Sequence, residues 1–217
     1  SRLMGKDAFL KELMAATLPA CTAILHMGAC SSTTETNEAY LRENNFEYTR
    51  SLAKYCLNKG IRFIYASSAA TYGAGENGYC DDESLLETLK PLNLYGASKQ
   101  WFDLWAKKEG VLKDMVGLKY FNVFGPNEYH KGGMQSMVRK GYLQVRDEGR
   151  LKLFKSYKEG FSDGGQERDF IYVRDAVAMT LFFLQNENVG GIYNVGSGVA
   201  RNWNDLATAV FRAANKK

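Results

Sequence analysis

The sequence predicts an α/β fold built on a parallel sheet. Amphipathic helical segments alternate with short apolar runs along the chain, which is the pattern of such a sheet. Three of the apolar runs end in polar or glycine-containing turns that lead toward a helix, at residues 26–32, 67–72 and 122–126. In open α/β sheets ligands bind beyond the carboxyl ends of the strands. We therefore expect these three turns to line one crevice.

The first half of the chain supplies three helices and three strands of this pattern. Gly60 is expected to stop the second helix, because glycine readily adopts the left-handed conformation that ends helices. A polar loop at 73–91 separates the second strand from the third helix. We expect helices at 7–16, 36–58 and 95–108, and strands at 23–25, 61–66 and 116–122.

The second half continues the alternation with shorter elements. A loop at 159–166 contains four glycine or serine residues and is expected to be flexible. The other expected elements are a helix at 134–148, a short strand at 151–155, an extended stretch at 170–173, a helix at 175–187, a strand at 191–195 and a helix at 203–214.

Composition describes an ordinary globular chain and excludes several classes of function. The 217 residues are 45% hydrophobic and 24% charged, enough to bury a core without disulfides or metals. The net charge of +4 could favour an anionic ligand such as a nucleotide diphosphate, but it is too small to argue for nucleic acid.

The cysteines, the histidines and the apolar runs exclude a zinc site and a membrane span. The four cysteines form no C-x-x-C pair, and the chain has only two histidines, so no metal site is expected. Scattered single cysteines suit a reducing cytoplasm. No apolar run reaches the roughly 18 residues of a membrane span.

Tyr95 and Lys99 form the main candidate for chemistry. They lie four residues apart at the start of a predicted helix, so both side chains project from one face. A neighbouring ammonium is expected to lower the pKa of the tyrosine from about 10 toward neutrality. Such a tyrosine can remove a proton from a sugar hydroxyl, while Ser67 and Ser68 at the preceding strand end hold that hydroxyl.

A second Y-x-x-x-K pair, Tyr55 and Lys59, shows that the spacing alone is weak evidence. Tyr55 falls in the last turns of a helix, just before Gly60 and the amino-terminal end of the next strand. That is the wrong edge of the sheet for a ligand. We interpret Tyr55 as a packing residue and Lys59 as a cation at a helix C-terminus.

The order of motifs along the chain resembles the extended short-chain dehydrogenase/reductases that act on nucleotide sugars. The resemblance implies an incomplete Rossmann-like, doubly wound parallel sheet with part of a small substrate-binding lobe. Residues 1–125 would be the cofactor-binding part without its first βαβ unit, and 126–217 a mixed segment that supplies the lobe and returns to the sheet. The motifs are YASSAATYG at 65–73, PLNLYGASK at 91–99, YFNVFGP at 120–126, RDFIYV at 168–173 followed by DAV at 175–177, and YNVGSG at 193–198.

Two further segments are similar to one branch of that family, the ADP-L-glycero-D-manno-heptose 6-epimerases of bacterial lipopolysaccharide biosynthesis. These segments are HMGACSSTTE at 26–35 and EYHKGGM at 128–134. The resemblance implies that NADP takes hydride from C6 of an ADP-heptose and returns it to the other face of a keto intermediate. Tyr95 and Lys131 would be the two acid/base groups, Lys99 would hold the nicotinamide ribose, and Ser68 would orient the reacting oxygen.

The resemblance also assigns the binding residues. Lys140 and Gly133 depart from the histidine and serine of the family, and the loop before Arg168 is longer than usual, which affects the alignment of 154–157. The cofactor set is Met27, Gly28, Ala29, Cys30, Ser31, Asn44, Lys99 and Lys131. The substrate set is Ser68, Asn122, Gly133, Lys140, Phe154, Lys155, Ser156, Tyr157 and Arg168.

Three residues also have a purely structural interpretation. We interpret His26 as a hydrogen-bonded core histidine with an indirect effect on the site, and Cys30 as a small buried residue instead of a nucleophile. Arg168 stands beside Asp169, and its planar fork suits a diphosphate better than a surface ion pair.

Alternatives stay open at this point. No G-x-x-G-x-x-G turn precedes Ala23, and by comparison with the family about fifty N-terminal residues and a C-terminal stretch lie outside this chain. The residues that choose between NADP and NAD would lie there. The chain could instead act as another nucleotide-sugar epimerase or dehydratase, similar to UDP-galactose epimerase, or as a non-catalytic binding module. The family resemblance implies a homo-oligomer.

Overall fold

The computed structural model describes residues 2–157 and 159–215, which form two compact units. Unit 1 comprises Ser1–Lys119 and Phe182–Tyr193, and unit 2 comprises Tyr120–Leu181 and Asn194–Lys217. Each unit is described by itself. The expected division into 1–125 and 126–217 concerns domains and stays a prediction.

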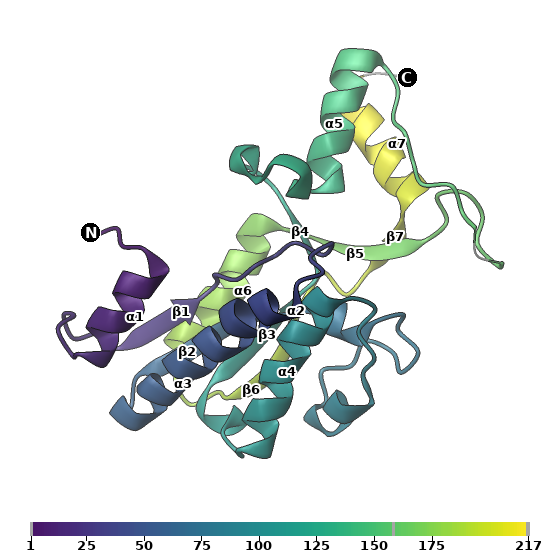
Figure 1. The fold of residues 1–217 in the computed structure, drawn as a ribbon. Helices are drawn as coiled ribbons and strands as arrows, with labels where there is room; N and C mark the ends of the chain where they lie inside the picture. The colour runs from purple at the N-terminus through teal and green to yellow at the C-terminus, as the bar shows by residue number, and fades with distance from the viewer. Residues whose placement is uncertain (1, 158, 216–217) are drawn as a thin grey trace. The chain divides into compact units, whose positions relative to one another are not determined.

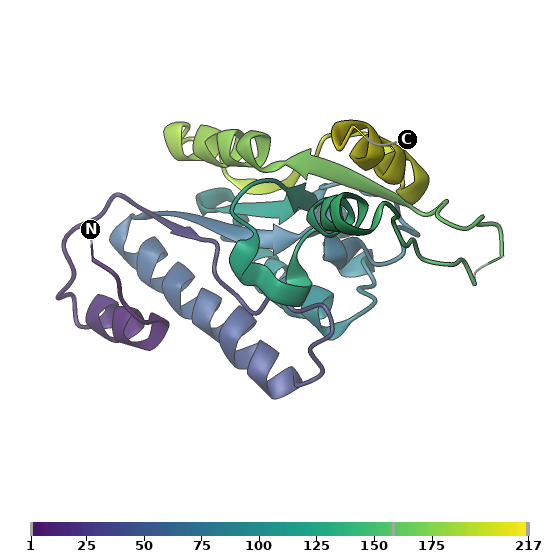
Figure 2. The same ribbon diagram turned by 90° about the horizontal axis from the view of Figure 1, so that it is seen from above.

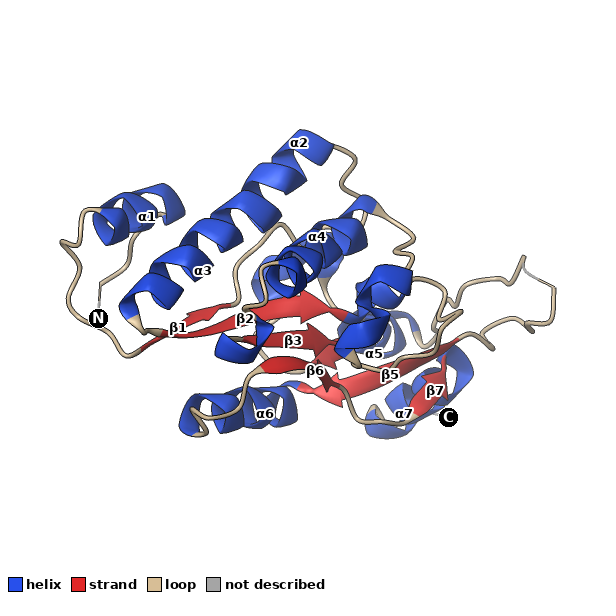
Figure 3. Ribbon diagram, turned by 90° about the horizontal axis from the view of Figure 1, so that it is seen from below, coloured by secondary structure: helices blue, strands red, loops and turns tan. Residues whose placement is uncertain are grey.

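Unit 1 is organised around a four-stranded sheet with the order β1-β2-β3-β6 (Figure 1). β1 and β2 pair in parallel, with His26 opposite Tyr65, and the arrows of the four strands point the same way in Figure 3. The predicted parallel α/β sheet is therefore confirmed. The strands are β1 (Ala23–His26), β2 (Arg62–Ser68), β3 (Val116–Tyr120) and β6 (Gly191–Val195), of which residues 191–193 belong to unit 1.

Helices cover one face of this sheet (Figure 3). The predicted helix at 36–58 is continuous from residue 38 to residue 59, with a π-helical turn in its middle, and it ends at Gly60 with φ +63°, as predicted. Asn93 begins the next helix by accepting a hydrogen bond from Gly96 N at 2.8 Å. The helices are α1 (Lys6–Met14), α2 (Glu38–Leu41), the π-helical turn (Arg42–Glu47), α3 (Tyr48–Lys59) and α4 (Leu94–Lys108).

The core of unit 1 lies between the sheet and these helices. Phe63 and Ile64 of β2 and Leu118 of β3 have no exposed surface, as expected for central strands of a parallel sheet. Gly117 lies directly against the ring of Tyr65, where an added Cβ would stand 2.4 Å from the tyrosine hydroxyl. The tight packing fixes the ends of β2 and β3, from which the candidate site is built.

Unit 2 holds a three-stranded sheet and several helices, of which α5 and α7 pack together. β4 (Asn122–Phe124) and β5 (Glu167–Tyr172) pair in parallel, and β7 (Ala200–Asn202) joins β5 in antiparallel fashion. The helices are α5 (Met137–Glu148), α7 (Trp203–Ala213) and α6 (Val173–Gln185), of which residues 173–181 belong to this unit. Part of the connection between α5 and β5 extends away from the helices as a loop (Figure 2).

The structure corrects several predicted elements. No strand forms at 151–155, because Leu151 and Leu153 pack against the core of α5 and α7 while Lys152 N donates to Gln144 Oε1 at 3.0 Å. The strand predicted at 116–122 divides into β3 and β4, which belong to different sheets. Helix α5 begins at residue 137, after a 3₁₀ turn at Tyr129–Met134.

One boundary and one strand in the second half were also predicted wrongly. Val173 was predicted as extended and instead begins helix α6, and strand β7 was missed. In the described part of the chain, no helix has the length and apolar character needed to cross a membrane.

Candidate active site

The centre of the candidate site in unit 1 is a hydrogen bond between Ser68 and Tyr95. Ser68 is the last residue of β2 and Tyr95 lies in the first turn of α4. The hydroxyl of Ser68, which is 8% exposed, accepts a hydrogen bond from Ala70 N at 3.1 Å. The hydroxyl therefore keeps its own proton and a second lone pair for the bond with Tyr95. The strand end and the helix start thus bring together two residues that are 27 positions apart in sequence.

Lys99 lies one helical turn after Tyr95, as predicted, and is 7% exposed. Its ammonium donates to Ala66 O at 2.7 Å. Burial lowers the pKa of Lys99 to about 8, although the charges of Asp103 and Cys30 raise it. An ammonium has three donors, so this one retains donors for further acceptors, and a nicotinamide ribose presents suitable hydroxyls. The residues of this unit therefore fit that end of a dinucleotide.

The expected lowering of the Tyr95 pKa is wrong for the structure. Burial raises the pKa of Tyr95, and the hydrogen bond with Ser68 opposes this effect only in part. Lys99 directs its ammonium to Ala66 O, and its charge does not offset the burial. Tyr95 and Lys99 do lie one turn apart in the predicted helix. Their spacing does not determine which group the long lysine side chain contacts with its ammonium.

Asn45 fastens the loop after β1 to helix α4, and sequence reasoning missed it. Its Oδ1 accepts from Cys30 N at 2.8 Å, and its Nδ2 donates to Cys30 O at 3.0 Å and to Ser98 Oγ at 2.9 Å. Ser98 Oγ in turn donates to Tyr95 O at 2.7 Å. The predicted neighbour, Asn44, donates to Tyr40 O at 2.8 Å within its own helix.

A sequence signal for Asn45 did exist. Leu41, Thr49, Leu52 and Cys56 mark the buried stripe of this helix, and Asn45 stands in that stripe at helical spacing. A polar residue on a buried stripe needs hydrogen-bonding partners. Here the partners are the backbone of the loop that was predicted to run along a cofactor. Asn44 stays a prediction as a cofactor residue.

His26 is a core histidine, as the structural interpretation held. Its Nε2 lies 2.9 Å from Thr49 Oγ1. Thr49 already donates its own proton to Asn45 O at 2.7 Å, so His26 donates through Nε2–H. Burial, together with the charge of Lys99, lowers the pKa of His26 to about 4. The ring is therefore neutral near pH 7.

The predicted cofactor loop after His26 is mostly open. Met27, Gly28, Ala29 and Ser31 are exposed, whereas Cys30 is half-buried and its thiol forms no disulfide. The loop is therefore fixed at Cys30 by Asn45, with its other residues accessible.

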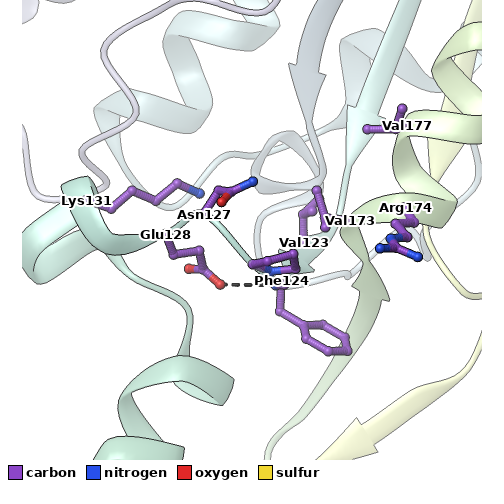
Figure 4. A pocket seen from close by; sticks show the side chains of 10 residues that line it. Val123, Phe124, Asn127, Glu128, Lys131, Val173, Arg174 and Val177 are labelled. Carbon is purple, nitrogen blue, oxygen red and sulfur yellow. Dashed lines mark hydrogen bonds between the residues drawn. The ribbon is translucent and has the colours of Figure 1, made fainter.

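In unit 2, Lys131 lies in the 3₁₀ turn between β4 and α5, on the wall of a pocket of about 500 Å³. Figure 4 shows it beside Asn127 and Glu128, with Arg174 of α6 across the pocket. The turn is held by the carboxylate of Glu128, which accepts from Gly125 N at 3.1 Å. It also accepts from Ser136 N at 2.6 Å and Ser136 Oγ at 2.8 Å.

Glu128 is 5% exposed and stays charged despite its burial. Burial would raise the pKa of this carboxyl, but the hydrogen bonds from Ser136 and Gly125 and the charge of Lys131 lower it overall. The side chain of Lys131 is exposed. Sequence reasoning predicted Lys131 and did not single out Glu128, which closes the turn that carries it.

The predicted substrate residues of unit 2 are partly brought together. Lys140 Nζ donates to Gly133 O, so these two lie side by side. Asn122 Nδ2 donates to Asp169 O at 3.0 Å. Arg168 is exposed and its Nη1 donates to Glu167 O at 2.6 Å.

Arg168 does not form the surface ion pair with Asp169 that was its structural interpretation. The carboxylate of Asp169 instead accepts hydrogen bonds from Ser197 N, Ser197 Oγ and Gly198 N at 2.7–2.8 Å. The guanidinium of Arg168 therefore remains accessible for an anion.

The residues at 154–157 form an exposed stretch. Phe154 is 58% exposed, although its ring centroid lies 6.0 Å from that of Trp203, and Tyr157 is 92% exposed. Lys155 is exposed, and Ser156 N donates to Asp163 Oδ1 at 2.7 Å.

The expected common crevice involves both units. Residues 26–32 and 67–72 lie in unit 1, where the parallel pairing of β1 with β2 places them at the same sheet edge. Residues 122–126 lie in unit 2, and their part in the crevice stays a prediction.

Comparison with known proteins gives a family match over most of the chain and relatives with a common name. The model of the NAD dependent epimerase/dehydratase family matches residues 4–196. An ADP-L-glycero-D-manno-heptose-6-epimerase from Nitratidesulfovibrio vulgaris (strain DP4) is 53% identical over 213 residues, which cover 98% of this chain and 66% of the relative. One from Fusobacterium nucleatum is 56% identical over 196 residues, which cover 89% of this chain and 59% of the relative.

Comparison with solved structures also gives epimerases as relatives. The ADP-L-glycero-D-manno-heptose-6-epimerase of Helicobacter pylori has a TM-score of 0.78 and 28% identity, over 95% of this chain and 62% of that one. A UDP-N-acetylglucosamine 4-epimerase from Methanobrevibacter ruminantium has a TM-score of 0.77 and 26% identity, over 95% and 66%. A UDP-glucose 4-epimerase from Thermus thermophilus, solved with NAD, has a TM-score of 0.70 and 25% identity, over 98% and 67%.

The chain spans 58–66% of the length of the curated relatives. The resemblance to nucleotide-sugar dehydrogenase/reductases, stated from motifs, is confirmed at the level of family and fold. The family is described as NAD dependent, in agreement with a nicotinamide cofactor. With the family model covering residues 4–196 of 217, this chain belongs to the NAD dependent epimerase/dehydratase family.

Proposed function

We propose that the protein of which this chain is a part inverts C6 of ADP-D-glycero-D-manno-heptose through a keto intermediate. Relatives that are 46–56% identical carry the name of that activity, which supports the substrate. The observation that carries the proposal is the cluster of Ser68, Tyr95 and Lys99, in which a hydrogen-bonded tyrosine stands one helical turn before a buried ammonium.

The roles in unit 1 follow from that cluster. A bound NADP, with NAD as the alternative, supplies hydride acceptance and return. Ser68 orients the C6 oxygen, and Tyr95 exchanges the proton of that oxygen for one of the two C6 configurations. For Tyr95 to act near neutral pH its raised pKa must fall, and the Lys99 ammonium is the cation of this cluster that can lower it. With a pKa of about 8, Lys99 is mostly charged at pH 7.

Inversion needs a second acid/base group, and we assign this role to Lys131. Its exposed side chain on the wall of a pocket supports the assignment, and the family resemblance supplies the role. Asn122, Gly133, Lys140, residues 154–157 and Arg168 are assigned to the ADP-heptose. From the same resemblance we propose a cytoplasmic homo-oligomer that serves lipopolysaccharide inner-core biosynthesis.

The test uses the full-length protein with ADP-D-glycero-D-manno-heptose, and NMR reports the configuration at C6. We expect conversion toward the L-glycero epimer at a rate proportional to protein concentration. No inversion in the presence of bound cofactor would sink the assignment.

A second candidate is a 4-epimerase of UDP-sugars. It is supported by the structural likeness to UDP-N-acetylglucosamine and UDP-glucose 4-epimerases at 25–26% identity. The same experiment therefore includes UDP-glucose and UDP-N-acetylglucosamine as substrates. Inversion at C4 of either one, without reaction at C6 of the heptose, favours the second candidate. No turnover of any of the three sugars favours a non-catalytic binding module.

A further inference from the structure

A completely buried ion pair lies beneath the Ser68–Tyr95 bond, and the proposed chemistry does not use it. Lys119 of β3 and Asp103 of α4 are both 0% exposed, with 2.8 Å between Nζ and Oδ2. Taking two charges out of water costs about as much as their attraction returns, so an apolar pair would stabilise a fold equally well. A stability argument therefore does not account for these two charges.

The carboxylate of Asp103 is fully hydrogen-bonded. Its Oδ1 accepts from Tyr65 OH at 2.9 Å, and its Oδ2 accepts from Ser67 Oγ at 2.7 Å and from Lys119. Tyr65 and Ser67 both belong to β2. Asp103 thus fixes the side chain of the residue that directly precedes Ser68.

Lys119 reaches Ser68 from the other side. Its Nζ also donates to Thr71 Oγ1 at 2.7 Å, and Thr71 Oγ1 donates to Ser68 O at 2.8 Å. The ammonium also lies 5.2 Å from the centroid of the Tyr72 ring. Ser68 is therefore fixed at its carbonyl through Thr71 and at its preceding residue through Ser67, which leaves its hydroxyl directed to Tyr95.

Asp103 has a second neighbour in the site, because it follows Lys99 by one turn of α4. Its negative charge favours the ammonium form of Lys99, against the effect of burial. Cys30, after β1, also acts to raise the pKa of Lys99. Asp103 is the only carboxylate among the groups that act on Lys99 in the described part of the chain.

We propose that the Lys119–Asp103 ion pair positions a reacting group: through Ser67 and Thr71 it holds Ser68 against Tyr95. Neither residue touches substrate or cofactor, so both are positioning residues. The inference rests on the proposed function only for the choice of the turnover assay.

The test compares the double variant Asp103→Asn/Lys119→Met with the wild type in the full-length protein. Each single variant leaves a partner unpaired in the core and is expected to unfold, whereas removing both charges restores folding. We expect a melting temperature near that of the wild type and a kcat reduced about tenfold or more, with KM within about threefold. A fall in kcat without a matching rise in KM separates misplacement of Ser68 from a general loss of structure.

A matched control and a second variant keep the test decisive. Lys107→Met/Glu87→Gln removes a surface ion pair between α4 and the 3₁₀ turn Glu83–Thr88, with 3.0 Å between Nζ and Oε2, and should leave kcat unchanged. Thr71→Val removes only the link between Lys119 and the Ser68 carbonyl, and it should lower kcat even if the double variant does not fold. A folded double variant with wild-type kcat overturns the proposal, as does wild-type kcat in Thr71→Val.

Failure of the proposed function gives a different result. If the wild-type protein does not invert the heptose, crystal structures of the wild type and of Thr71→Val still test the positioning of Ser68. The distance between Ser68 Oγ and the Tyr95 oxygen should lengthen beyond hydrogen-bond reach, about 3.5 Å, in the variant. An unchanged hydrogen bond overturns the inference whatever the substrate.

Discussion

The two units hold their candidate residues in opposite ways. In unit 1, Ser68 and Lys99 are 8% and 7% exposed and belong to regular elements, where each has a hydrogen-bond partner. In unit 2, Lys131 and Arg168 are exposed, and Tyr157 is 92% exposed in a loop.

The difference separates chemistry from recognition. Groups fixed by folding are preorganised, so little energy is spent on ordering them at the moment of reaction. Exposed side chains must be ordered when a ligand binds, which costs affinity. We therefore expect substitutions in the buried cluster to affect kcat most, with recognition spread over the exposed residues.

The largest effect is expected from Tyr95→Phe. Removing the phenol oxygen removes the proposed acid/base group, and kcat for C6 inversion should fall about 10³-fold with NADP still bound. The loss is measured by stopping the reaction at set times and determining the configuration at C6 by NMR. Tyr55→Phe is the matched control, since Tyr55 belongs to the other Y-x-x-x-K pair, and it should stay within about twofold of the wild type. Activity in Tyr95→Phe within tenfold of the wild type contradicts the role of Tyr95.

Lys131→Met tests whether substitution of an exposed residue can lower kcat as substitution in the buried cluster does. If Lys131 is the second acid/base group, kcat should fall about 10²-fold, because the methionine cannot carry a proton. The control is Lys152→Met, another exposed lysine of unit 2. A change confined to KM would make Lys131 a binding residue and would sharpen the contrast between the units.

The same contrast explains how far the sequence could predict the fold. Elements of unit 1 were predicted within a few residues, because long helices and buried strands have strong periodicity. The false strand at 151–155 lies in unit 2, where alternating Leu151 and Leu153 face a helix pair instead of a second strand. Hydrophobic alternation does not say what covers the apolar side.

Prediction of the site followed the same pattern. Ser68, Tyr95 and Lys99 could be placed because strand ends of a parallel sheet share one edge. Asn45 was missed although its place on a buried helical stripe was readable. The Lys119–Asp103 pair was missed because its partners are distant in sequence: Asp103 contacts Ser67 across 36 positions and Lys119 across 16. No local pattern signals such long-range pairing.

Asn45→Ala tests whether folding itself prepares the site in unit 1. Loss of the side chain leaves buried backbone groups of Cys30 without partners, and the free energy of unfolding should fall by about 2 kcal/mol. Urea denaturation measures it. Asn44→Ala is the neighbouring control, and its loss should stay within about 0.5 kcal/mol, because that amide bonds only within its helix. Equal losses of unfolding free energy in the two variants would contradict the role of Asn45 in holding the loop after β1 to helix α4.

The smallest effect is expected from His26→Gln, measured as a difference in acid stability. The folded pKa of about 4 lies below the ordinary histidine value of 6.5, so between these values the unfolded chain binds a proton that the folded chain does not. The stability contribution of neutral His26 is therefore complete above pH 6.5 and is lost as the pH falls toward 4.

Glutamine does not titrate but keeps an N–H donor for Thr49, so His26→Gln removes this pH dependence with little change in packing. Between pH 7 and pH 5 the wild type should lose up to about 2 kcal/mol more stability than the variant. Urea denaturation at the two pH values gives the difference. Parallel losses in the two proteins would mean that His26 takes up its proton in the folded state, and the wall formed by β1 beside Lys99 would then be open to water.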